Sequence, residues 1–126
     1  MGKNKVLLVE DYEDSRLAMK YIIEEFGYEV IEAADGQEAI DQAQNECPSL
    51  ILMDIGLPKI DGIQATYTIK SQICPNVPIV AVTAYENARD YALAAGCLDV
   101  IKKPVDFAQM GEVLRSYCHG NADAAS

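Results

Sequence analysis

The sequence has no long apolar run and no excess of positive charge, and each absence excludes a class of protein. No uninterrupted apolar stretch approaches the roughly 20 residues of a membrane-spanning helix, and residues 1–5 lead into a candidate strand without the apolar segment of a signal peptide. Twenty acidic residues against 10 basic ones give a net charge of −10, which repels nucleic-acid phosphates and anionic lipids. We therefore predict a cytoplasmic protein without membrane insertion or direct nucleic-acid binding.

The sequence also lacks closely spaced cysteines. Its four cysteines form no CxxC pair, so neither a zinc site nor a thioredoxin-type motif is predicted. We expect free thiols in a reducing compartment, at Cys47, Cys74, Cys97 and Cys118.

What the sequence does contain is an alternation of apolar, strand-like runs with stretches of helical period. This pattern predicts an α/β fold in which helices cover both faces of a parallel sheet. The expected strands, each followed by a helix, are 5–10, 29–33, 50–54, 79–83 and 100–102. A chain of 126 residues, half of them apolar, can bury one core. We predict a single domain over 1–126, with its core at about 5–117 and a polar tail at 119–126.

Turn and cap signals bound several of these helices. The pair Asp35-Gly36 begins the second helix, and Gly27 and Gly96 end the first and the fourth. The fourth helix is expected to be short. Asp14 and Ser15 are candidate caps of the first helix, whose predicted buried residues are Leu17, Ala18, Tyr21, Ile22 and Phe26. The last helix begins near Asp106, and its predicted buried residues are Phe107, Met110, Leu114 and Tyr117.

Chemically useful side chains end four of the predicted strands. Asp54 ends the run 50–53, and Glu10 and Asp11 follow the run 6–9. Thr83 ends another run, and Lys103 follows the last strand. Because ligands of open α/β sheets bind beyond the carboxyl ends of the strands, all five residues fall at the edge where a site is expected.

Taken singly, each of these residues has an ordinary structural explanation. Asp54 could cap a helix or form a turn, and Glu10 and Asp11 could be a solvated acidic turn before a helix. Thr83 could be a β-branched strand residue, and Lys103 a surface cation. Together, however, three converging carboxylates repel one another unless a cation lies among them. Mg²⁺ is the predicted cofactor, because it prefers oxygen ligands and commonly shares its coordination sphere with a phosphoryl group.

This arrangement predicts phosphoryl transfer to a carboxylate. Asp54 would attack a phosphoryl donor, with Mg²⁺ held by Asp54 and Asp11 and with Glu10 beside them. Lys103 would pair with one phosphoryl oxygen, and Thr83 would hydrogen-bond another. The charge of the resulting aspartyl phosphate would reposition a nearby hydroxyl and loop, so the protein would act as a switch.

The same residues belong to a series of motifs in a fixed order. These are Val-Glu-Asp at 9–11, Met-Asp-Ile-Gly-Leu-Pro at 53–58, Asp-Gly at 61–62, Thr-Ala at 83–84, Ala-Ala-Gly at 94–96 and Lys-Pro at 103–104. In this order the sequence resembles the receiver domain of bacterial two-component response regulators, from Lys5 to Tyr117.

The resemblance implies a flavodoxin-like, doubly wound fold with strand order 2-1-3-4-5 and five helices. It also implies a cis peptide bond before Pro104. The roles it implies are phosphoacceptor for Asp54, switch hydroxyl for Thr83, phosphate contact for Lys103, and metal ligation by Glu10, Asp11, Asp54 and the backbone carbonyl of Gly56.

The resemblance further implies that partners act in trans. The one histidine, His119, lies in the polar tail, so a histidine kinase or a histidine phosphotransfer protein would supply the phosphoryl group. No output domain is present, so another protein would read the altered surface, on a monomer or a phosphorylation-dependent dimer. A stand-alone receiver is the leading interpretation. The alternative is a receiver excised from a larger response regulator or hybrid kinase.

The sequence departs from the receiver pattern in three ways. Val100 stands where the family usually has an aromatic residue that moves with the switch threonine. The spacing from Thr83 to Lys103 is about two residues short of the family pattern, which predicts a trimmed fourth helix or preceding loop. Gly56 stands where a larger side chain often covers the site, so we expect altered dephosphorylation kinetics.

Two other protein classes use similar features. An aspartate-based Mg²⁺ phosphatase of the haloacid-dehalogenase type needs a second aspartate two residues after the nucleophile, and that position is Gly56. A flavin carrier needs glycines and hydroxyls in its phosphate loop, whereas residues 11–14 are largely acidic. A receiver-like scaffold that has lost phosphorylation is the third alternative, and the intact set of acids, hydroxyl and lysine disfavours it.

Overall fold

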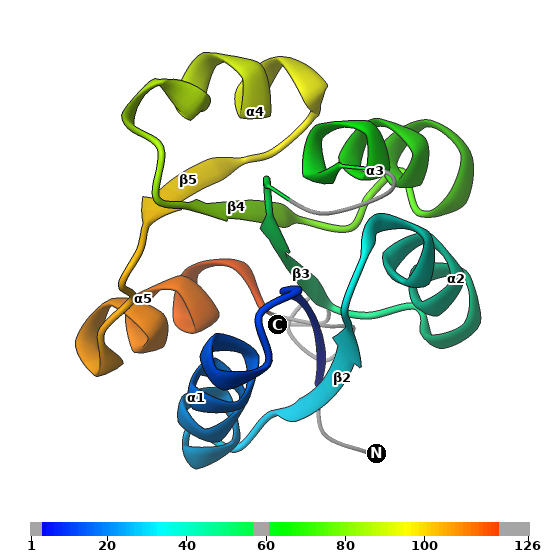
Figure 1. Cartoon of the computed structure of the whole chain (residues 1–126). Coiled ribbons are helices and arrows are strands. Elements are labelled where there is room, and N and C mark those ends of the chain that lie inside the picture. Colours follow the sequence, from blue (N-terminus) through cyan, green and yellow to red (C-terminus); the bar gives the residue numbers. More distant parts are fainter. Residues whose placement is uncertain (1–3, 57–60, 119–126) are drawn as a thin grey trace.

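The computed structural model describes residues 4–56 and 61–118. Within these residues the chain forms one parallel sheet of five strands in the order β2-β1-β3-β4-β5, which confirms the predicted topology (Figure 1). The strands are β1 (Lys5–Val9), β2 (Glu29–Ala33), β3 (Leu50–Asp54), β4 (Ile79–Thr83) and β5 (Asp99–Lys102). Three strands have the predicted bounds, β1 ends one residue early, and β5 begins one residue early. Pro58, His119 and the predicted polar tail lie outside the described residues.

Helices cover both faces of the sheet, as predicted. On one face lie α1 (Glu13–Glu25) and α5 (Phe107–Tyr117), and on the other lie α2 (Gly36–Glu46), α3 (Gly62–Thr68) and α4 (Arg89–Ala95) (Figure 1). A π-helical turn, η1 (Ile69–Ile73), continues α3, and a 3₁₀ turn, η2 (Glu86–Ala88), precedes α4. The fourth helix has seven residues, which confirms that it is short.

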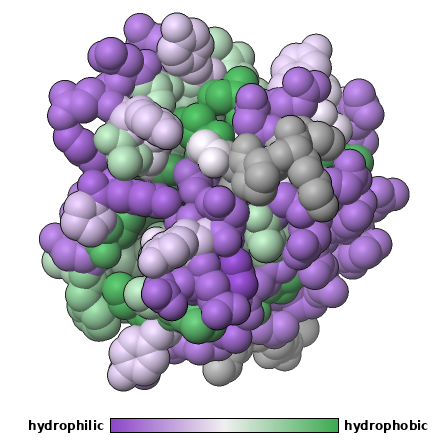
Figure 2. All heavy atoms as spheres, in the orientation of Figure 1, coloured by the Kyte–Doolittle hydropathy of each residue, from purple (hydrophilic) through white to green (hydrophobic). Residues whose placement is uncertain are grey.

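Two apolar cores lie on either side of the sheet. Alternate residues of β1 enter different cores: Val6 and Leu8 pack with α1 and α5, and Leu7 and Val9 pack with α2, α3 and α4. Because helices cover both faces, all five residues of β3 are buried, which is why central parallel strands have continuous apolar sequences. Hydrophilic side chains dominate the face of the molecule in Figure 2, consistent with the acidic composition.

The predicted buried face of α1 is wrong in part. Met19 and Ile23 are buried, whereas Leu17 and Tyr21 are 49% and 65% exposed. Ala18 is exposed as well, while Ile22 and Phe26 are partly buried as predicted. The helix carries apolar residues at helical spacing on two faces, so periodicity alone did not identify the one that meets the sheet. Neither Asp14 nor Ser15 caps the helix, since its N-cap is Tyr12 and makes no side-chain cap bond.

The prediction for α5 is mostly confirmed. Asp106 caps it by accepting a hydrogen bond of 2.7 Å from the Gln109 amide, and Met110 and Leu114 are fully buried. Tyr117 is partly buried. Phe107 is 54% exposed rather than buried, because its ring lies on the edge of the core against Phe26, with ring centroids 4.5 Å apart.

The other predicted helix ends are confirmed. Asp35 accepts a hydrogen bond of 2.8 Å from the Glu38 amide at the start of α2. Gly27 and Gly96 follow α1 and α4 with φ of +94° and +120°, a conformation that glycine adopts at little cost. All four cysteines lie in the described part of the chain and are free thiols. Of the helices described, none is both long enough and apolar enough to cross a membrane.

Candidate functional site

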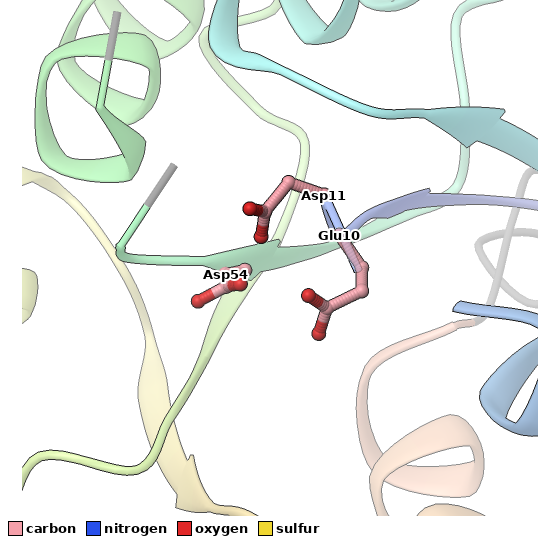
Figure 3. A group of neighbouring side chains, drawn as sticks. All are labelled: Glu10, Asp11 and Asp54. Carbon is pink, nitrogen blue, oxygen red and sulfur yellow. The ribbon is translucent and has the colours of Figure 1, made fainter. Parts of the chain in front are cut away.

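Three carboxylates meet where β1 and β3 end. The two strands pair in parallel, with Val9 opposite Met53, so the residues that follow each strand emerge side by side. One carboxylate oxygen from each of Glu10, Asp11 and Asp54 lies within 4.8 Å of the others (Figure 3). Glu10 and Asp54 are 1% and 8% exposed, while Asp11 is exposed. The predicted acidic cluster is therefore present and opens to solvent on the Asp11 side.

Lys103 brings a cation into this cluster. Its Nζ lies 3.3 Å from Asp54 Oδ2 and also donates a hydrogen bond to Glu10 Oε1. The Lys103 amide donates to the Thr83 carbonyl at 2.9 Å, which ties the loop after β5 to the end of β4. The peptide bond between Lys103 and Pro104 is cis, as the resemblance implied.

The charge of Lys103 is stabilised where it lies. Burial acts to lower the pKa of the ammonium, but the hydrogen bond to Glu10 and the charge of Asp54 outweigh burial, and the pKa is raised above its usual value. The lysine is thus a permanent cation at neutral pH. It offsets part of the repulsion among the carboxylates.

Backbone amides fix the orientation of the two buried carboxylates. The Gly56 amide donates to Asp54 Oδ1 at 3.1 Å, and the Tyr12 amide donates to Glu10 Oε2 at 3.1 Å. Together with Lys103, these amides give each oxygen of both carboxylates a donor. The acids are therefore held in place before any ligand binds.

Thr83 is buried at the end of β4, with 2% of its surface exposed. Its hydroxyl oxygen accepts a hydrogen bond of 3.0 Å from the Tyr85 amide. The hydroxyl proton can still be donated to an acceptor in the site.

The start of α3 packs directly behind Asp54. The Gly62 amide donates to the Ile55 carbonyl at 3.1 Å, and Asp61 caps the helix by accepting from the Gln64 amide at 2.9 Å. A β-carbon on Gly62 would lie 2.2 Å from the Asp54 carbonyl oxygen. The Asp-Gly motif at 61–62 therefore supplies a helix cap and the one residue without a side chain that this close approach requires.

Tyr85 lies beside Gly56, the position at which receivers often have a larger side chain. A β-carbon on Gly56 would lie 3.6 Å from Tyr85 Cε2 and 3.8 Å from its hydroxyl oxygen. The Tyr85 side chain thus stands over the space that a larger residue at 56 would occupy, although 67% of it is exposed. Val100 lines a surface pocket together with Thr83 and Tyr85. Its aliphatic side chain stands there in place of the aromatic residue usual in receivers.

Sequence analysis also missed Arg16. This residue of α1 donates to the Glu10 carbonyl at 2.9 Å and forms an ion pair of 3.0 Å with Glu32 on β2. The one signal in the sequence was a basic residue five positions after Asp11, near the start of the predicted helix, and such a residue is usually a solvated helix position.

Comparisons with known proteins identify the family. The sequence matches the family model of the response regulator receiver domain over residues 6–115. It is 36% identical over 115 residues to the polar-differentiation response regulator DivK of Brucella ovis, a match that covers 89% of this chain and 94% of DivK.

Solved receiver structures have the same fold. The receiver domain of the sensor histidine kinase PA1611 from Pseudomonas aeruginosa is 33% identical, with a TM-score of 0.86 over 94% of this chain and 98% of that one. That structure has a magnesium ion coordinated in its active site cleft. The chemotaxis protein CheY4 of Vibrio cholerae is 26% identical, with a TM-score of 0.85 over 92% of this chain and 99% of that one.

A five-stranded parallel sheet with acids, a threonine and a lysine at its carboxyl edge is the architecture of a signalling receiver. The chain belongs to the response regulator receiver domain family of two-component systems. Members of this family are signalling proteins rather than classical enzymes, so the phosphatase and flavin-carrier alternatives are not retained.

Proposed function

We propose that this protein is a phosphorylation-dependent switch that accepts a phosphoryl group on Asp54 from a histidine kinase or a histidine phosphotransfer protein. The observation that carries the proposal is the position of Lys103, whose Nζ bridges Glu10 and Asp54 inside a cluster of three carboxylates. One buried carboxylate, such as Glu10, would be enough to pair with Lys103, so stability does not require Asp54 and Asp11 as well. Excess acid on a solvent-open edge fits a site that receives a cation and an anion together.

The donor set fits magnesium. Carboxylate oxygens are the ligands Mg²⁺ prefers, and the exposed Asp11 side leaves room for the waters and phosphoryl oxygens that complete its coordination. We assign Glu10, Asp11, Asp54 and the backbone carbonyl of Gly56 to the metal. When bound, Mg²⁺ supplies positive charge against the carboxylates and the phosphoryl oxygens.

The transfer needs one bond to form and one to break. A carboxylate oxygen of Asp54 attacks phosphorus, the phosphorus–nitrogen bond of the donor phosphohistidine breaks, and the departing imidazole takes up a proton from water. Lys103 pairs with an oxygen of the transferred group, and the Thr83 hydroxyl donates to another. No residue of this chain has to act as a proton carrier for this step.

The switch follows from the bonds of Thr83. Turning its hydroxyl toward a phosphoryl oxygen removes the acceptor that the Tyr85 amide uses at 3.0 Å. The loop from Tyr85 into η2 then loses a contact with β4. A downstream protein would read the resulting surface, on a monomer or on a phosphorylation-dependent dimer.

The chain as a whole, residues 1–126, is proposed to act as one receiver domain in the cytoplasm, where its kinase partner would be found. The match to 94% of DivK supports a stand-alone response regulator. Similarity to the receiver of a sensor histidine kinase supports the second candidate, a receiver from a larger regulator or hybrid kinase.

Intact mass spectrometry tests phosphorylation directly. The chain is incubated with Mg²⁺ and acetyl phosphate, beside Asp54→Ala and the control Asp90→Ala, which removes an exposed acid on α4. We expect one added phosphoryl group in the native chain and the control, and none in Asp54→Ala. No adduct in a native chain that binds Mg²⁺ and is also presented with phosphorylated histidine kinase would reject the proposal.

A further inference from the structure

The backbone of Glu10 is held on both sides by groups outside the acidic cluster. The Glu10 amide donates to the Ala33 carbonyl of β2 at 3.0 Å. The Glu10 carbonyl accepts from Arg16 Nη1 at 2.9 Å. Since this carbonyl belongs to the peptide plane that ends at the Asp11 Cα, the guanidinium restrains the orientation of the plane from which Asp11 begins.

Arg16 is itself held by a second contact. Its Nε lies 3.0 Å from Glu32 Oε1, and Lys20 Nζ lies 3.0 Å from the other oxygen of the same carboxylate. The hydrogen bond from Lys20 lowers the pKa of Glu32, burial acts to raise it, and the hydrogen bond from Arg16 lowers it further. The pKa is lowered overall, so this carboxylate is ionised at neutral pH. The Arg16 side chain is 15% exposed, against 31% for Lys20. The planar guanidinium thus spans two fixed acceptors, which an ammonium cannot match with the same geometry.

The charge of Arg16 alone would act against a metal. It places a cation directly behind the residues assigned to Mg²⁺, so its field repels Mg²⁺, and removing it should tighten binding. Its hydrogen bond has the opposite effect, because a ligand fixed in advance loses less freedom on binding. The charge of Arg16 weakens Mg²⁺ binding and its hydrogen bond strengthens it, so the direction in which the Kd changes when Arg16 is removed shows which effect is larger.

We propose that Arg16, braced by Glu32, is a positioning residue that orients the Glu10–Asp11 peptide so that Asp11 faces Asp54 and the metal. This inference rests on the proposed function, since it concerns the same site. Arg16 touches neither the phosphoryl group nor the metal. It acts through the backbone of its neighbours.

Calorimetric titration of the full chain with Mg²⁺, at fixed pH and ionic strength, tests the proposal without relying on phosphorylation. For Arg16→Ala we expect the Kd for Mg²⁺ to rise on the order of tenfold, as for other outer residues that orient metal ligands. Lys20→Ala is the matched control, because it removes a cation from the same Glu32 without touching Glu10. The Kd of Lys20→Ala for Mg²⁺ should equal the native value or be lower.

Arg16→Lys keeps the charge but cannot serve both acceptors in the same way, and it provides the test if Arg16→Ala does not fold. We expect Mg²⁺ binding weaker than native in this variant too, with thermal unfolding in EDTA confirming a folded chain. A native Kd in Arg16→Lys, or an unchanged or tighter Kd in folded Arg16→Ala, overturns this inference alone. A native chain that binds no Mg²⁺ overturns the proposed function and this inference with it.

Discussion

Gly62 and Asp54 are in contact through their backbones, with no room for a side chain between them. A β-carbon on Gly62 would lie 2.2 Å from the Asp54 carbonyl oxygen and 2.7 Å from Ile55 Cα. Both neighbours are backbone atoms, so relief would require β3 or α3 to move. The helix thereby forms a rigid backing for the proposed phosphoacceptor.

We expect Gly62→Ala to lower the free energy of unfolding by about 2 kcal/mol, as for other overpacked sites, and to slow phosphorylation by acetyl phosphate. Gly27→Ala is the control: its β-carbon would meet nothing within 4 Å, so only its φ of +94° resists the change. That strain should cost about 1 kcal/mol and leave phosphorylation unaffected. Urea unfolding and intact mass measure the two effects, and a Gly62→Ala chain as stable and reactive as native would contradict the contact.

Mg²⁺ should raise the melting temperature of the native chain. A ligand that binds only the folded state stabilises it by about 2.7 kcal/mol at 100 times its Kd. We expect a smaller rise in Asp54→Ala and in Asp11→Ala, because each loses an oxygen ligand. Asp14→Ala, which removes a nearby acid outside the cluster, should respond as the native chain does. A native melting curve that is insensitive to Mg²⁺ would count against the metal site.

The lifetime of the aspartyl phosphate should depend on the contact between Gly56 and Tyr85. Gly56→Met adds a side chain whose β-carbon would meet Tyr85 at ordinary contact distance, so we expect less access for water and a longer lifetime. Tyr85→Ala removes the ring and should shorten it. Acyl-phosphate decay, followed by intact mass, compares both with Tyr91→Ala, another exposed tyrosine. Equal lifetimes in all four proteins would show that neither residue controls access.

The ion pairs of Lys103 should give the fold a dependence on alkaline pH. The pKa of Lys103 is raised above 10.5 in the folded state, so the charged form favours folding. This contribution is complete below the unfolded pKa and is lost as the pH rises through the folded value.

Without Mg²⁺, Lys103→Met should lose stability at neutral pH, up to about 3 kcal/mol, because Glu10 then loses its partner in a buried position. The deficit relative to native should shrink above pH 10.5. Lys102→Met is the control, since Lys102 pairs with Glu86 on the surface, where solvent screens the charges, and this change should affect stability little. Denaturant unfolding at several pH values would exclude this account if the deficit persisted unchanged at high pH.

The two apolar faces of α1 should respond very differently to truncation. Met19 is 6% exposed and packs with α5 and the sheet, so Met19→Ala should cost about 3 kcal/mol. Leu17 is 49% exposed, and Leu17→Ala should change stability by less than about 0.5 kcal/mol. Similar losses in both variants would mean that the helix presents a different face to the sheet.

The sequence predicted those parts of the fold that local patterns control. Continuous apolar runs identify buried parallel strands, and the residues that end them fall at one edge whatever the details of packing, which is why Asp54 and Thr83 could be placed. The buried face of α1 could not, because Leu17 and Met19 belong to apolar sets of similar spacing. The burial of Met19 and the bonds of Arg16 to Glu10 and Glu32 show how the helix is rotated.

Contacts between distant segments were also beyond sequence analysis. The approach of Tyr85 to Gly56 depends on how the loop after β4 lies beside the loop after β3. The bond from Lys103 to Glu10 joins residues 93 positions apart. The resemblance implied that this lysine contacts phosphate, but it did not show that a buried glutamate is its partner.

Thr83 joins two different loops to the end of β4. Its side chain holds the Tyr85 amide, and its backbone carbonyl holds the Lys103 amide. Rotation about the Cα–Cβ bond moves the hydroxyl but leaves the carbonyl where it is. In the proposed switch, rotation of this one side chain would therefore release the segment that leads to α4, while the segment that carries Lys103 stays attached to β4 and keeps its place beside the phosphoryl group.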